Sequence, residues 1–133
     1  MRAHHDIKIG YEWSALELEL LAEDAPEVFS ELAQLAREGR VTFYNGTYAQ
    51  PHLQTLSAEA NILQLEYGID VYRRLTLPSP LTYAHQEASV HDQTPQLLVA
   101  FGLRYAALPG FFSTRSVNSQ GGERRRVRAR AGW

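Results

Sequence analysis

Apolar and polar residues alternate at the start of the chain and then recur at helical spacing. Residues 7–13 place an apolar side chain at every second position, a period that predicts a strand. Residues 16–22 have the pattern of a helix. A second helix is predicted to begin at Asp24, read as its N-cap, with Pro26 in the first turn, and to end at Gly39.

The next segment has two readings. Residues 41–44 are β-branched and aromatic, which predicts a short strand. Asn45 and Gly46 follow, and Asn-Gly between two extended runs is a strong hairpin signal. Residues 47–52 do not alternate as a return strand would. The pattern therefore favours a strand that opens into a polar loop over a hairpin.

The second half of the chain repeats the alternation of helix and strand. Ser57 is a predicted N-cap for a long helix, and residues 81–84 form a predicted strand. A short helix over residues 96–101 is predicted after Thr94, read as a cap, and residues 104–108 form a fourth predicted strand. The apolar stripe of the long helix consists of Ile62, Leu65, Ile69 and Tyr72.

Strands and helices that alternate in this order favour an α/β fold with a parallel sheet covered by helices, either doubly wound or barrel-like. We expect one domain over residues 1–112. Residues 113–133 show no usable periodicity and few apolar side chains, which predicts a disordered tail.

The distribution of charge sets the tail apart from the rest of the chain. The acids and bases of residues 1–112 sum to 7 − 14 = −7, whereas those of residues 113–133 sum to 6 − 1 = +5. The tail lacks interleaved aromatic residues, so nucleic acid is not an expected partner. Cysteine is absent, and no apolar run is long enough for a membrane span. We therefore expect a cytoplasmic protein with no membrane partner.

Candidate chemistry gathers after the second and third predicted strands. Binding residues of parallel α/β folds collect at the carboxyl ends of strands. Glu87 is the best candidate for an acid, base or nucleophile, although a solvated loop residue is the competing reading. Tyr48 offers a ring on which a sugar can stack, with packing over the sheet end as the alternative. The remaining candidates in these two loops are Gln50, His52, His85 and Gln86.

Three stretches together resemble a known family. "EGRVTFYNGTYAQPH", "NILQLEYGIDVYRRL" and "HQEASVHDQTPQLLVAFGLRYAAL" resemble, in order and spacing, the N-terminal catalytic domain of glycoside hydrolase family 38, the α-mannosidase family. The resemblance covers residues 7–112. It implies a seven-stranded α/β barrel that binds zinc and hydrolyses α-mannosides with retention. Counting back from Pro95 places Gln86 at the nucleophile position, and a shift of one residue places Glu87 there.

The same resemblance implies a substrate loop and a metal site. Tyr48 stands where the family has a tryptophan, and Gln50 and His52 replace acidic neighbours. Independently of the resemblance, His85 is a further expected sugar contact, and metal ligation is the alternative, although its spacing matches no strong metal signature. The family's zinc ligands find no counterpart, so this chain alone is expected to bind no zinc and to be inactive. The expected partner is carbohydrate, and the alternative function is a non-catalytic carbohydrate-binding or structural remnant. Four strands cannot close a barrel, so self-association through exposed sheet edges is expected as well.

Overall fold

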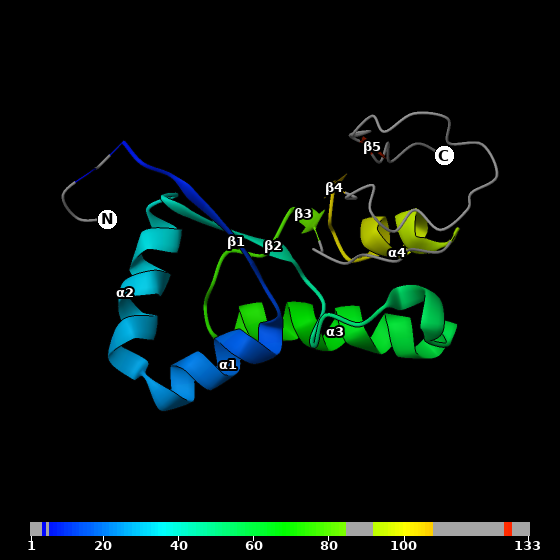
Figure 1. The fold of residues 1–133 in the computed structure, drawn as a ribbon, viewed down its shortest axis with the longest axis horizontal. Coiled ribbons are helices and arrows are strands. Elements are labelled where there is room, and N and C mark those ends of the chain that lie inside the picture. The colour runs from blue at the N-terminus through cyan, green and yellow to red at the C-terminus, as the bar shows by residue number, and fades with distance from the viewer. Residues whose placement is uncertain (1–3, 5, 85–91, 108–126, 129–133) are drawn as a thin grey trace.

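The structure is a computed structural model that describes residues 4, 6–84, 92–107 and 127–128 (Figure 1). Strands and helices alternate along most of this length, as the sequence pattern predicts. In chain order the elements are β1 (Ile9–Trp13), α1 (Ala15–Asp24), α2 (Pro26–Arg37), β2 (Val41–Asn45), the 3-10 turn η1 (Leu53–Thr55), α3 (Ala58–Arg74), β3 (Thr82–Ala84), α4 (Thr94–Ala100), β4 (Tyr105–Ala107) and β5 (Val127–Arg128).

The first four strands run parallel in two pairs. β1 pairs with β2 in a register that places Trp13 beside Asn45, and β3 pairs with β4 so that Ala84 lies beside Ala107. β2 also lies next to β3, so the two strand pairs are neighbours. The α/β class with parallel strands is thus confirmed. A seven-stranded incomplete barrel is not confirmed, because the described strands form a two-stranded and a three-stranded sheet.

The two-residue strand β5 comes from the basic tail. It pairs antiparallel with β4, with Val127 opposite Ala106 and Arg128 opposite Tyr105. The other residues of the segment 113–133 lie outside the described residues. The boundary at residue 112 and the disorder of the tail therefore stay predictions.

One face of β1 and β2 is covered by helices. Val41 and Phe43 of β2 are buried against Leu18 of α1 and against Val71 and Tyr72 of α3. Figure 1 shows α1 and α3 side by side beneath the strands. A second cluster of buried side chains lies under β3 and β4 and consists of Leu53, Leu65, Tyr83, Leu98 and Leu103. α3 contributes to both clusters and so joins the two strand pairs.

Of the three predicted N-cap residues, the structure confirms one. The prediction of Asp24 as an N-cap is wrong: α1 continues through Asp24, and Ala25 occupies the cap position without a side-chain hydrogen bond. Thr94 is likewise the first helical residue of α4, and Gln93 is its N-cap. Ser57 is confirmed, because its hydroxyl accepts from the amide of Ala60 at 3.2 Å.

Candidate functional site

The loop after β2 is shaped by Asn45. Its side-chain Oδ1 accepts hydrogen bonds from the Thr47 amide at 3.1 Å and from the Thr47 hydroxyl at 2.7 Å. Both residues are fully buried. Asn45 has a φ of 93°, in the left-handed region that asparagine tolerates better than most residues, and Gly46 follows at +91°. The chain thus leaves β2 by a sharp turn, and residues 47–52 do not return as a strand.

This loop is held between two helices. The first amides of α1 donate to it: Ala15 to the Thr47 carbonyl at 3.1 Å and Leu16 to the Tyr48 carbonyl at 2.9 Å. On the other side, the Tyr48 amide donates to the Gln64 carbonyl of α3 at 2.8 Å. The side-chain oxygen of Gln64 accepts from the Ala49 amide at 2.9 Å. Amides at a helix start need partners, and here the loop carbonyls supply them.

Gly68 lets α3 approach the turn closely. A Cβ atom at this position would collide with the Gly46 carbonyl oxygen and would lie 2.7 Å from the Thr47 carbonyl carbon. A Cβ carbon does not approach a non-bonded heavy atom this closely in folded proteins. The glycine in the second resembling stretch therefore serves the packing of helix against loop.

Tyr48 extends from this loop over α1 and α3. Its half-buried ring packs against the first core cluster, and its centroid lies 6.4 Å from that of Tyr67 at an interplanar angle of 75°. A hydrogen bond with the Glu19 carboxylate raises the pKa of the Tyr48 hydroxyl, and desolvation adds to this shift. Tyr48 therefore packs against α1 and α3, and packing was the alternative to a sugar contact in the sequence analysis. A sugar contact by Tyr48 stays a prediction.

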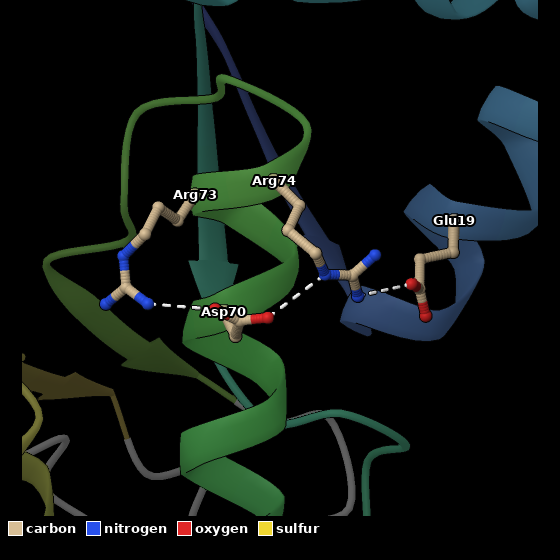
Figure 2. Close-up of polar contacts among 4 residues, drawn as sticks. All are labelled: Glu19, Asp70, Arg73 and Arg74. Carbon is tan, nitrogen blue, oxygen red and sulfur yellow. Dashed lines mark hydrogen bonds and ion pairs between the residues drawn. The ribbon is translucent and has the colours of Figure 1, made fainter.

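Charged side chains next to Tyr48 link the same two helices (Figure 2). Arg74 of α3 donates from Nη2 to Glu19 of α1 at 2.5 Å and from Nε to Asp70 at 3.0 Å. Arg73 donates to the other oxygen of Asp70 at 2.8 Å. These bonds to Glu19 and then Asp70 raise the pKa of Arg74 and keep its guanidinium charged. The result is a bridge of alternating charges between α1 and α3.

The other predicted contacts fall into two groups. Gln50 is half-buried with a φ of 47°, and His52 is exposed at the start of η1, where its carbonyl accepts from Thr55. Tyr48, Gln50 and His52 thus share one loop. Predictions for His85, Gln86 and Glu87 lie outside the described residues, so their roles stay predictions.

Glu12 is not among the residues predicted from the loops. Tyr11 and Trp13 pack on the helix-covered side, so Glu12 lies on the opposite face of β1, in register with Tyr44. Burial, and secondarily the charge of Glu12, raises the pKa of the Tyr83 hydroxyl. The sequence could have predicted this orientation of Glu12. Successive residues of a strand point to opposite faces, so a charged residue between two apolar ones faces away from them.

No three histidine, cysteine, aspartate or glutamate side chains come together, in the part of the chain that the structure describes, in a way that could hold a metal ion. These residues do not fit the zinc implied by the resemblance, and the expectation that the chain binds none stays a prediction.

Membrane insertion has no support in the described helices. None of them combines the length and the apolar character that crossing a bilayer requires.

Solved structures of other proteins superpose on this fold. The 4-alpha-glucanotransferase from Thermococcus litoralis superposes with a TM-score of 0.66 at 21% identity, over 75% of this chain and 16% of that chain. A CE4 family pseudoenzyme from Bacillus anthracis, BA3943, gives a TM-score of 0.59 at 18% identity, over 76% of this chain and 33% of that one. The fold is therefore of the type found in carbohydrate-active glycosidases and esterases.

A third structure extends the comparison. A family 4 carbohydrate esterase from Streptomyces lividans, solved in complex with acetate, gives a TM-score of 0.53 at 9% identity, over 77% of this chain and 61% of that chain. The chain thus spans about a sixth of the glucanotransferase and less than two thirds of the esterase. No curated protein sequence matches the chain.

The chain belongs to glycosyl hydrolase family 57, whose family model matches residues 1–128. The prediction of a glycoside hydrolase is confirmed at this level. The assignment to family 38 is not supported, and neither is an α-mannosidase. Short stretches such as a helix that ends in Glu-Gly-Arg before a strand follow from the α/β architecture, so they do not separate two families that share it.

Proposed function

We propose that this chain forms part of a carbohydrate-active enzyme of family 57 that acts on an α-1,4-linked glucan. The family match over residues 1–128 is the observation that carries this proposal. The fold shared with a 4-alpha-glucanotransferase supports the glucan as the substrate.

The proposed reacting group is the carboxylate of Glu87. It follows β3 by three residues, and β3 lies beside β2, whose own carboxyl end carries the preformed loop of Asn45, Tyr48 and Gln50. Polar loops that follow neighbouring parallel strands meet at one edge of the sheet. Glu87 would attack the anomeric carbon of the sugar while the glycosidic oxygen leaves, which forms a glycosyl ester on the carboxylate. Gln86, His85, Gln50 and His52 are proposed to contact the sugar.

Complete turnover needs a second carboxylate. In a retaining glycosidase the two carboxyl groups lie about 5–5.5 Å apart, and the second one protonates the leaving group. The sequence offers no convincing second carboxylate for this role. We therefore propose that this chain alone does not turn over an unactivated glucan. We also propose that it requires no zinc for its own part of the site and that it self-associates through its open strand edges.

An activated sugar tests Glu87 without the missing acid. A fluorinated α-glucosyl fluoride carries a leaving group, fluoride, that departs without protonation, so a nucleophile alone can be trapped as a stable ester. We expect the intact chain to gain the mass of one fluoroglucosyl group and Glu87→Gln to gain none. Gln86→Ala serves as the matched control, because it changes the neighbouring side chain and keeps the carboxylate.

A specific result would favour the alternative function. If the unaltered chain binds maltoheptaose but takes no label, then it is a non-catalytic carbohydrate-binding section of the family. If Glu87→Gln is labelled as fully as the unaltered chain, then another group is the nucleophile.

A further inference from the structure

An aromatic and charged surface lies on the outer side of α1 and α3. We call it the Tyr67 surface; it consists of Tyr48, Tyr67, Asp70, Arg74 and Glu19. Tyr67 is 55% exposed, although its ring stands edge-on to the half-buried ring of Tyr48. A side chain that served only to join the helices would bury more of its area. Single exposed aromatic side chains are common on protein surfaces, so the case for a ligand rests on the groups around this ring.

The members of this surface are contiguous. Tyr67, Asp70 and Arg74 are three, then four, residues apart on α3, so they share one side of the helix. Glu19 completes the set from α1 through its hydrogen bond with Arg74 (Figure 2). Its carboxylate also bonds the Tyr48 hydroxyl. The rings and the ion pairs therefore form one continuous surface whose side chains are held in place before any ligand arrives.

Charge restricts what this surface can bind. Glu19 and Asp70 balance Arg73 and Arg74, so the ion-pair bridge has no net charge, and residues 1–112 as a whole sum to −7. An anionic ligand would find no excess positive charge there. A neutral ligand that offers a flat apolar face and several hydroxyl groups fits both halves of the surface. The ring takes the apolar face, and the oriented carboxylate and guanidinium groups bond the hydroxyls.

Arg74 retains a donor for such a ligand. Its Nε and Nη2 are used by Asp70 and Glu19, whereas Nη1 makes no hydrogen bond within the part of the chain that the structure describes. The two carboxylates fix the plane of the guanidinium, and the side chain of Arg74 is 54% exposed. A planar group held in this way loses little freedom when it forms one further hydrogen bond.

We propose that the Tyr67 surface binds a neutral oligosaccharide chain next to the strand-end site, with which it shares Tyr48. A sugar ring stacks on Tyr67, and its hydroxyl groups bond Arg74 and Asp70. The choice of an α-glucan as the ligand rests on the proposed function, whereas the preference for a neutral sugar rests on the surface itself. In a polymer-acting enzyme, such a surface would hold one part of the chain while another part reacts.

Calorimetric titration of the chain with maltoheptaose tests the proposal. We expect Tyr67→Ala to weaken the binding that depends on this surface by about tenfold, the loss expected for one aromatic contact. Tyr67→Phe should retain most of the affinity, since stacking needs the ring. Tyr105→Ala is the matched control, because Tyr105 is 45% exposed but lies on β4, away from α1 and α3. Circular dichroism of each variant shows that it is folded.

Three results would overturn the proposal. The first is maltoheptaose affinity in Tyr67→Ala equal to that of the unaltered chain, and the second is an equal loss in Tyr105→Ala. The third is sedimentation that shows a second copy covering Tyr67, together with no sugar binding. Glu87→Gln separates this proposal from the catalytic one. If the fluoride labels nothing while Tyr67-dependent binding persists in Glu87→Gln, then the proposed nucleophile fails and the Tyr67 surface stands.

Discussion

Asn45 combines a strand end, a turn and a side-chain hydrogen-bond acceptor in one residue. Its Oδ1 must be the atom that faces Thr47, because the Thr47 amide can only donate. This leaves Nδ2 buried, with no partner among the residues described. The first turn of the loop is therefore set by two hydrogen bonds, at the cost of one unmatched donor.

We predict that Asn45→Ala lowers the free energy of unfolding by about 2 to 3 kcal/mol, through two lost hydrogen bonds and an alanine forced to a positive φ. Asn45→Gly keeps the backbone conformation and removes the unmatched nitrogen, so it should cost less, about 1 kcal/mol. Urea denaturation of both variants measures the difference. Equal stability of the two variants would show that the positive φ of residue 45 does not matter.

At Gly68 the usual effect of a helical Gly-to-Ala change should reverse. Alanine normally stabilises a helix by about 1 kcal/mol relative to glycine. Here its methyl group would overlap the backbone of Gly46 and Thr47, so we predict that Gly68→Ala destabilises the chain by about 2 to 3 kcal/mol. Glu66→Ala, an exposed change on the same helix, is the control and should stay within about 0.5 kcal/mol. A gain in melting temperature for Gly68→Ala would contradict the close contact.

The helices α1 and α3 are joined by packing more than by charge. Leu18, Val71 and Tyr72 are fully buried, whereas the side chain of Arg74 is half exposed in its bond to Glu19. Exposed ion pairs contribute little, because water screens the charges and ordering long side chains costs entropy. The bridge thus orients side chains on the outer surface without supplying much of the stability.

We predict that a double-mutant cycle of Glu19→Gln and Arg74→Met yields a coupling energy below about 1 kcal/mol. The coupling should shrink further between low salt and about 1 M salt, where screening acts over only a few ångströms. Thermal unfolding of the four proteins measures it. Coupling above about 3 kcal/mol that does not change with salt would mean that the pair acts as a buried ion pair.

For the whole molecule, two buried tyrosines predict sensitivity to alkali. Burial raises the pKa of the Tyr72 and Tyr83 hydroxyls well above the ordinary value of about 10. Below pH 10 both states hold these protons, and their contribution to stability is complete. Above pH 10 the unfolded chain releases protons that the folded chain retains, so stability falls as the pH rises towards the folded-state pKa values.

The expected loss is about 1.4 kcal/mol per pH unit for each tyrosine once the pH exceeds 10. Tyr72→Phe and Tyr83→Phe should each remove half of this slope. At pH 7 neither change should cost much, because neither hydroxyl has a hydrogen-bond partner within the described residues. Urea midpoints at pH 7, 10 and 11 test this, and an unchanged slope in both variants would place the alkaline sensitivity elsewhere.

The sequence pattern predicted the order of the elements, because apolar residues recur at every second position in a strand and at every third or fourth position in a helix. Two pairs of parallel strands, the Ser57 cap and the open loop after Asn45 are confirmed. The helix starts at Asp24 and Thr94 were misplaced, because a residue type that often caps a helix can also occupy its last or first turn. Ile62 belongs to the predicted stripe but is exposed, since α3 covers the sheet with a narrower face there.

The candidate site could be predicted only in part. The shared loop of Tyr48, Gln50 and His52 followed from the strand end. The direction of the Tyr48 side chain depends on its contacts with Glu19 and Tyr67. Both residues lie on other elements, so the sequence around Tyr48 does not indicate these contacts. Family membership was predicted only as far as the class of glycoside hydrolases, because different families share the same strand-and-loop arrangement.

Peptide mapping after reaction with the fluorinated α-glucosyl fluoride tests most directly that this chain carries the reacting carboxylate of a family 57 enzyme. Mass spectrometry should place one fluoroglucosyl group on the peptide that contains Glu87, and Glu87→Gln should abolish it. A label on a different carboxylate, such as Glu12, or no label in a folded chain that binds maltoheptaose, would contradict that assignment.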